Sequence, residues 1–222
     1  AAAGALINTG QDCTAATRAI VAADLYDDFV AGVGELFGKI VVGDPEDPDT
    51  DIGPLITAAH RAKVAGMVER APGEGGRIVT GGVAPDGPGS FYRPTVIADV
   101  SEQSEVWRDE IFGPVLTVRP FTDDDDALRQ ANDTAYGLAA SAWTRDVYRA
   151  QRASREIHAG CVWINDHIPI ISEMPHGGFG ASGFGKDMSQ YSLEEYLSIK
   201  HVMSDITGVA DKEWHRTVFA KR

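Results

Sequence analysis

The fold is decided by residues 115–164, VLTVRPFTDDDDALRQANDTAYGLAASAWTRDVYRAQRASREIHAGCVWI. Short runs of small or β-branched residues alternate in this stretch with amphipathic runs, in the order strand, helix, strand, helix, strand. The predicted strands cover residues 115–118, 139–143 and 161–164, and the predicted helices cover 127–131 and 147–157. This alternation is typical of crossover units, which build a mostly parallel sheet.

The same alternation extends toward the amino terminus. A predicted strand at 19–23 is followed by apolar residues at helical spacing, with Asp24 expected to cap the first turn; these residues are Leu25, Phe29, Val33 and Leu36. A second helical stripe precedes a short run at 78–79 and a glycine turn at 81–82, and it consists of Val64, Met67, Val68 and Ala71. We therefore predict an α/β fold, an open, mostly parallel twisted sheet with helices on both faces.

Composition and charge limit the classes of function. The chain has 222 residues, 43% of them hydrophobic and 24% charged, which is typical of a folded protein in water. At roughly 150 residues per domain this gives one large domain or one and a half small ones, with a core that needs no disulfides. A formal net charge of −13 repels polyphosphate backbones and anionic lipid headgroups. We therefore expect neither a nucleic-acid partner nor a membrane partner.

The two cysteines, Cys13 and Cys161, lie far apart in the sequence. The chain shows no signal-peptide pattern and no long apolar run, which favours a reducing compartment, a cytoplasmic location and free thiols. Residues 1–5 lack an initiator methionine and run directly into LINTGQ (6–11), without the polar segment that usually precedes a domain. We therefore expect a piece of a longer polypeptide.

Cys13 is the first candidate for chemistry. It follows a glycine turn at Gly10 and precedes small residues, where a short helix can begin. A thiol at a helix N-terminus gains thiolate character from the unpaired amides and the helix dipole. The sequence therefore predicts a nucleophile here, with a small buried hydrophobic residue as the alternative. Cys161 stands beside Val162 and Trp163 in an apolar predicted strand, and we expect it in the core.

Two other segments are candidates for a binding crevice. In DEIFGPV (109–115), Glu110 and Phe112 lie two residues apart at the mouth of a predicted strand, so both can face one crevice. A carboxylate there can accept hydrogen bonds from sugar hydroxyls; a solvated Glu110 beside a core Phe112 is the alternative. Residues 174–186, MPHGGFGASGFGK, hold five glycines, so we expect a loop whose backbone closely approaches another surface. Its spacing excludes a Walker phosphate loop, and His176 within it is predicted to be a pocket wall.

Seven sequence blocks, taken in order, resemble the carboxy-terminal half of NAD(P)-dependent aldehyde dehydrogenases. The resemblance spans about residues 7–206 and is carried by GQDC (10–13), GPL (53–55), YRPT (92–95), EIFGP (110–114), ANDTAYGLA (131–139), GCVWIN (160–165) and SGFGK (182–186). The segments SEMPHGG (172–178) and GKDMS (185–189) look most like the aminobutyraldehyde dehydrogenases of polyamine breakdown. Betaine-aldehyde-type and broader aldehyde dehydrogenases are close relatives.

The resemblance implies a mechanism and a set of site residues. Cys13 would attack the aldehyde carbon, the thiohemiacetal would pass hydride to the nicotinamide, and water would hydrolyse the resulting thioester. The Cys13 amide would supply one donor of the oxyanion hole. Glu110 would take the nicotinamide-side ribose hydroxyls, and Phe112 would pack near the ring or the ribose. His60 and Lys63 match positions that reach the adenosine ribose.

The resemblance also implies what lies outside this chain. In the family an upstream half carries the dinucleotide-binding domain, the asparagine of the oxyanion hole, the glutamate that activates the deacylating water, and the residues that choose NAD or NADP. We therefore divide the chain into a catalytic domain (1–195), an oligomerisation strand (196–207) and a tail (208–222). We expect a homo-oligomer, dimer or tetramer, built through that strand. The cofactor is expected to be bound mostly by the amino-terminal half, which would be a partner of this chain, and this chain alone is expected to have negligible turnover.

The substrate is predicted to be a small-molecule aldehyde, and the expected charge of the pocket favours an amino aldehyde. Asp166, Glu173 and His176 are expected to flank the pocket lip, where carboxylates attract a distant ammonium group; solvated loop charges that touch no substrate are the alternative. No metal site is expected, since the acidic run 123–126 is predicted to start a helix. Two other functions stay open, a non-catalytic interaction module that pairs through its last strand and a thiol esterase that needs only Cys13 and hydrogen-bond donors.

Overall fold

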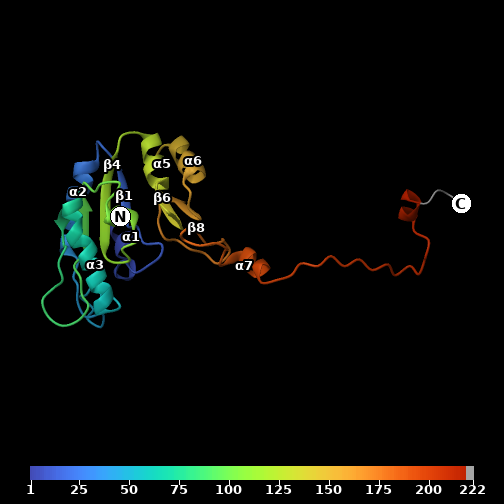
Figure 1. Ribbon diagram of the computed structural model, residues 1–222, viewed down its shortest axis with the longest axis horizontal. Helices are drawn as coiled ribbons and strands as arrows, with labels where there is room; N and C mark the ends of the chain where they lie inside the picture. The colour runs from blue at the N-terminus through green and yellow to red at the C-terminus, as the bar shows by residue number, and fades with distance from the viewer. Residues whose placement is uncertain (219–222) are drawn as a thin grey trace.

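A computed structural model describes residues 1–218 of the chain (Figure 1). Its main sheet has four strands in the order β1-β4-β3-β2; these are β1 (Arg18–Ala22), β4 (Val115–Phe121), β3 (Thr95–Ala98) and β2 (Arg77–Thr80). β1, β4 and β3 are parallel, and β2 is antiparallel to β3 at one edge. The predicted mostly parallel sheet is therefore confirmed, with one antiparallel edge strand.

The other strands form two small sheets beside the main one. β6 (Ala139–Ala142) pairs in parallel with β7 (Cys161–Ile164), and β5 (Tyr136–Gly137) pairs antiparallel with β8 (Phe179–Gly180). The order of strands and helices over residues 115–164 is as predicted. In the described part of the chain, however, β6 and β7 form their own ladder and do not extend the main sheet.

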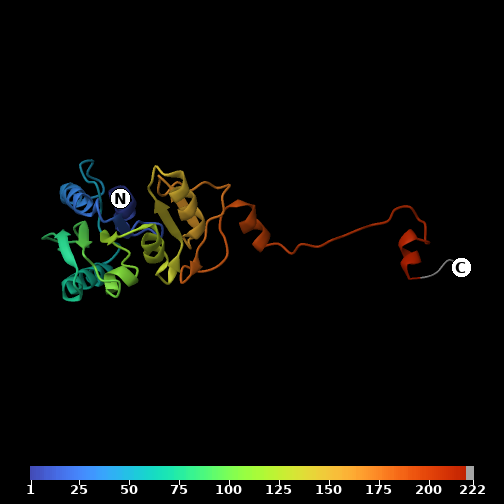
Figure 2. The ribbon, with the colours of Figure 1, turned by 90° about the horizontal axis from the view of Figure 1, so that it is seen from above.

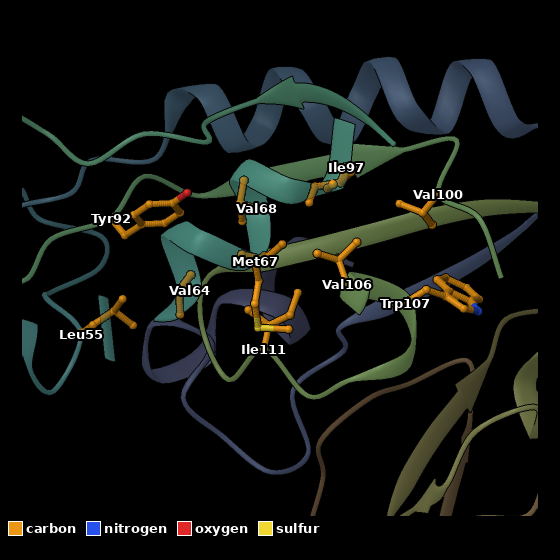
Figure 3. Close-up of a cluster of buried hydrophobic side chains, with 12 residues drawn as sticks. Leu55, Val64, Met67, Val68, Tyr92, Ile97, Val100, Val106, Trp107 and Ile111 are labelled. Atoms are coloured by element: carbon orange, nitrogen blue, oxygen red, sulfur yellow. The ribbon is translucent and has the colours of Figure 1, made fainter. Parts of the chain in front are cut away.

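Helices cover both faces of the main sheet, as predicted. Figure 2 shows α2 (Tyr26–Lys39, blue) and α3 (Ala58–Arg70, teal) on opposite sides of the strands. The α3 side is a cluster of buried apolar side chains, drawn in Figure 3, with Leu55 and Tyr92 at one end and Trp107 at the other. The predicted α3 stripe is confirmed, because all four of its members are buried in this cluster.

The buried face of α2 differs from the prediction. Val33 is buried as predicted and Phe29 packs against the same cluster, but the other core side chains are Tyr26, Val30 and Phe37. Leu25 and Leu36 are 58% and 48% exposed. The Tyr26 hydroxyl explains the rotation, because it donates to Asp99 Oδ1 at 2.8 Å and so fixes the first turn against the sheet. The predicted cap is also wrong, since α2 begins after Leu25 and no side chain caps it.

The remaining helices are short. They are α1 (Ala2–Leu6), η1 (Ile7–Gly10), η2 (Ala71–Glu74), α4 (Glu105–Arg108), α5 (Asp124–Asn132), α6 (Val147–Glu156), α7 (Ser189–Glu195) and η3 (Glu213–Thr217). The acidic run does start a helix, because the Asp123 carboxylate accepts from the backbone N–H of Asp126 at 2.9 Å and caps α5. No helix among the described residues is long and apolar enough to cross a membrane.

After α7 the chain leaves the body and runs away from it (Figure 1). Residues 196–206 form no strand in the single chain, and their large apolar side chains are exposed; these are Tyr196, Leu197, Ile199, Val202, Met203 and Ile206. The oligomerisation strand at 196–207 stays a prediction, because its partner would be a second chain. Within the predicted tail, η3 is followed by residues 219–222, which lie outside the described residues.

Candidate active site

The turn that carries Cys13 packs against the loop that carries Glu110. Between α1 and the turn the backbone is left-handed at three consecutive residues, ending with Gly10 at φ +72°. A Cβ atom on Gly10 would lie only 2.0 Å from the carbonyl oxygen of Gly113. Only glycine permits this conformation and this approach together, so Gly10 is what brings the two loops into contact.

The Cys13 turn is held by a carboxylate. Asp12 Oδ1 accepts from the backbone N–H of Thr14 at 2.7 Å and from the Thr14 hydroxyl at 2.6 Å. No helix starts at this turn, and the next regular element is β1. The prediction of a thiol at a helix N-terminus is therefore wrong, because the Asp12 side chain bonds the amide that a helix would have left free.

The electrostatic surroundings of Cys13 also differ from the prediction. The residue is exposed, but partial burial of the sulfur raises its pKa, and the charges of Asp12, Glu110 and Asp187 raise that pKa further. The residue's own backbone amide acts in the opposite direction. Because carboxylates disfavour a second negative charge nearby, these surroundings favour the thiol form of Cys13 over the thiolate, the opposite of the prediction.

Cys13, Glu110 and Phe112 line one pocket with a volume of about 930 Å³. The structure thus places Glu110 and Phe112 in one crevice, as their spacing predicted, and Cys13 lines the same crevice. Within residues 1–218, no N–H or O–H group donates to the Glu110 carboxylate, which is exposed. Its oxygens are therefore available to hydroxyl groups of a bound molecule.

His60 and Lys63 hold the Glu110 loop by hydrogen bonds to its backbone oxygens. His60 Nε2 donates to the backbone oxygen of Phe112 at 2.6 Å, and Lys63 Nζ donates to the backbone oxygen of Glu110 at 3.3 Å. Both residues lie on α3, which Thr57 caps by accepting from the backbone N–H of His60. Lys63 and Glu110 also line a second hollow of about 460 Å³.

The predicted lip residues do not line the pocket that holds Cys13. His176 Nδ1 is 2.7 Å from Asp187 Oδ1, the exposed Glu173 accepts from the Ser172 hydroxyl, and Asp166 accepts from the backbone N–H of His167. The carboxylates that act on Cys13 are instead Asp12 and Asp187, besides Glu110. Both carboxylates could have been considered from the sequence, because Asp12 directly precedes Cys13 and Asp187 directly follows the glycine-rich segment 174–186.

The glycine-rich loop makes the close backbone approach that its composition predicts. A Cβ atom on Gly160, the residue before β7, would lie 1.6 Å from the carbonyl oxygen of Gly177. The neighbouring Cys161 is partly exposed rather than in the core, as are the other three residues of β7, which pairs with β6 in a two-stranded sheet. The prediction of a core cysteine is therefore wrong.

Comparison with known proteins places the chain in a family. Residues 1–202 match the model of the aldehyde dehydrogenase family. The chain belongs to this family. It is 39% identical over 199 residues to a betaine aldehyde dehydrogenase of Bacillus subtilis, covering 88% of this chain and 41% of that protein. It is 44% identical over 199 residues to succinate-semialdehyde dehydrogenase [NADP(+)] 1 of Mycobacterium bovis, covering 90% of this chain and 44% of that protein.

Solved structures agree with the family assignment. A crystal structure of betaine aldehyde dehydrogenase from Staphylococcus aureus in complex with NAD+ matches 95% of this chain and 44% of that chain, with a TM-score of 0.88 and 34% identity. An aldehyde dehydrogenase from Bacillus cereus matches with a TM-score of 0.88 and 32% identity, covering 90% of this chain and 40% of that chain. The chain spans about two fifths of the length of the curated relatives it matches, 41% and 44% in the two named above.

Proposed function

We propose that this chain is the nucleophile-bearing catalytic part of an NAD(P)-dependent aldehyde dehydrogenase, with Cys13 as the residue that bonds to substrate. The observation that carries the proposal is the pocket shared by Cys13 and Glu110. An exposed sulfur can reach an aldehyde carbon there, and an unbonded carboxylate faces the same space. The family membership supplies the reaction class.

In the proposed reaction, the Cys13 thiol loses its proton and the sulfur bonds to the aldehyde carbon, giving a thiohemiacetal. The backbone N–H of Cys13 donates to the oxygen that becomes negative in this step. Hydride then leaves the same carbon, and a thioester on Cys13 results. Water cleaves the thioester to release the carboxylate and restore the thiol, so one aldehyde and one water yield one carboxylate, one hydride equivalent and two protons.

The pocket fits the nicotinamide end of a cofactor. Glu110 offers free carboxylate oxygens to ribose hydroxyls, and Phe112 lines the same pocket beside it. The cofactor, NAD or NADP, would supply the hydride acceptor. His60 and Lys63 hold the loop that presents both residues. We propose that these two residues act through the loop and that most of the cofactor is bound by an amino-terminal half absent from this chain.

We expect this chain alone to oxidise aldehydes negligibly, well below the roughly 1 per second of ordinary enzymes. Adding the amino-terminal half in trans should restore NADH formation, because it would supply the remaining oxyanion donor, the base and the cofactor domain. The measurement is absorbance of NADH with and without that half. Aldehyde turnover by the chain alone would contradict the proposal. Ester hydrolysis without NADH formation would indicate a thiol esterase. No activity with or without the amino-terminal half would favour an interaction module.

The proposed substrate is an amino aldehyde, such as aminobutyraldehyde. The charges of Asp12, Glu110 and Asp187 act on the reacting thiol, and their field attracts a substrate that carries an ammonium group. In the full-length protein, kcat/KM for aminobutyraldehyde should exceed that for butyraldehyde by about fivefold, since one partly screened ion pair contributes about 1 kcal/mol. The preference should shrink as salt is added. Equal specificity constants at low salt would remove the charge argument.

We also propose that the enzyme is a homo-oligomer built through residues 196–207. The support is the row of exposed apolar side chains along this segment, which a single chain leaves in water. An extended segment of this kind can add to the sheet of a second chain.

A further inference from the structure

We propose that His167 is a positioning residue for Cys13, holding the turn that presents the thiol against the body of the protein. The inference rests on the proposed function of Cys13. His167 follows β7, and its ring lies 153 positions along the chain from the turn that it contacts. It lines the same pocket as Cys13.

One hydrogen bond carries the contact. His167 Nε2 lies 2.9 Å from the carbonyl oxygen of Thr14, the residue after Cys13. A carbonyl only accepts, so Nε2 must carry the proton and donate. The other ring nitrogen, Nδ1, is buried and has no hydrogen-bond partner among the described residues. Burial lowers the pKa of His167, so the ring is the neutral tautomer with its proton on Nε2.

The ring is also fixed in place from other sides. A Cβ atom on Gly4 would lie 2.7 Å from His167 Cδ2, so α1 leaves space for the ring by having glycine at that position. The Trp163 ring packs edge-on against His167 at 5.2 Å between centroids, and Trp163 Nε1 donates to the backbone oxygen of Pro169 at 2.9 Å. The hydrogen-bond donor that reaches Thr14 is therefore itself held rigidly.

The other hydrogen bonds that the structure describes for residues 12–16 come from the turn itself or from α1. They are the Asp12 bonds to Thr14, a bond from the backbone N–H of Ala15 to the Asp12 oxygen, and one from Ala16 to the Gly4 oxygen. Among these contacts, the His167 bond is what ties the turn to the β6–β7 unit. Its loss would let the thiol move out of its partly buried place beside Asp12, Glu110 and Asp187.

The test is the pH profile of Cys13 alkylation by iodoacetamide in chains that carry Cys161→Ser. The parent should label with a midpoint above the ordinary thiol value of about 8.5. His167→Ala should move the midpoint down toward that value and raise the rate at pH 7.5 by about three- to tenfold, the range expected for losing one hydrogen bond. His167→Gln, whose side-chain amide N–H can replace Nε2, should stay within about twofold of the parent.

Two further variants keep the test decisive. His167→Phe fills the space of the ring without a hydrogen-bond donor and should show the alkylation profile expected of His167→Ala. It therefore replaces the alanine variant in the test if that variant does not fold. His201→Ala, on the exposed carboxy-terminal segment, should match the parent. A folded His167→Phe or His167→Ala with the parental profile would overturn the proposal, and so would a glutamine variant that fails to rescue it. The proposed function has a separate point of failure, a full-length Cys13→Ala variant that keeps its aldehyde oxidation.

Discussion

Replacing Cys13 by alanine in the full-length protein is expected to abolish aldehyde oxidation, lowering kcat by at least about a thousandfold. The reason is that Cys13 is the only thiol among the described residues that line the pocket, because Cys161 lies outside them. Aldehyde binding should change little, since the pocket keeps its shape. The measurement is steady-state NADH formation at saturating aldehyde.

The control for this variant is Cys161→Ala. Cys161 is the other free thiol of the chain, and it lies on β7 in a partly exposed place. Its replacement should leave kcat within about twofold of the parent, as is usual for a substitution away from the reacting atoms. A thousandfold loss of kcat in Cys161→Ala, with activity retained in Cys13→Ala, would show that Cys161 is the nucleophile and would contradict the role proposed for Cys13.

Replacing Gly10 by alanine is expected to destabilise the fold by about 2–5 kcal/mol, combining the cost of a left-handed alanine with steric overlap. The added methyl carbon would meet the Gly113 carbonyl oxygen at 2.0 Å, and a backbone atom cannot step aside as a flexible side chain can. Since that contact also joins the Cys13 turn to the Glu110 loop, the variant should lower the pH midpoint of Cys13 alkylation toward the ordinary thiol value as well as reduce stability. Urea unfolding of this chain, followed by circular dichroism, measures the first effect.

Gly32→Ala is the matched control. Gly32 lies inside α2, and a Cβ atom there would have no neighbour within 4 Å. Alanine is the better helix former, so the same chemical change should stabilise the protein by about 0.5–1 kcal/mol. If both variants unfold at the same urea concentration as the parent, the close contact between the two loops does not exist in solution.

The elements that the sequence predicted well are those whose local pattern and tertiary environment agree. The α3 stripe is buried as predicted because its apolar residues face one large cluster. The acidic run starts α5 because Asp123 both caps the helix and stands at its positive end. At α2 the local pattern was misleading, since Leu25 and Leu36 are apolar yet exposed. There the Tyr26 hydrogen bond to Asp99, 73 residues away in sequence, decides which face is buried.

Some features of the site could likewise be predicted from the sequence, and others depend on residues far apart in the chain. The spacing of Glu110 and Phe112 was enough to predict that these two residues face one crevice, whereas Cys13 was joined to them through the family resemblance. The sign of the charge effect on Cys13 could not be predicted, since it depends on whether a helix follows the turn and on Asp187, which lies far along the chain. His167 was missed because one histidine after a strand carries no signal until its partner, the Thr14 carbonyl, is known.

The central claim is that the substrate becomes covalently attached to Cys13 in a pocket walled by Glu110. The most direct test is acid quenching of the full-length protein during turnover with excess aldehyde and cofactor, followed by peptide mass mapping. The account predicts one acyl group per labelled chain, on the peptide that contains Cys13. An acyl group on the peptide that contains Cys161, or turnover without any acylated cysteine in samples quenched before the steady state, would contradict it.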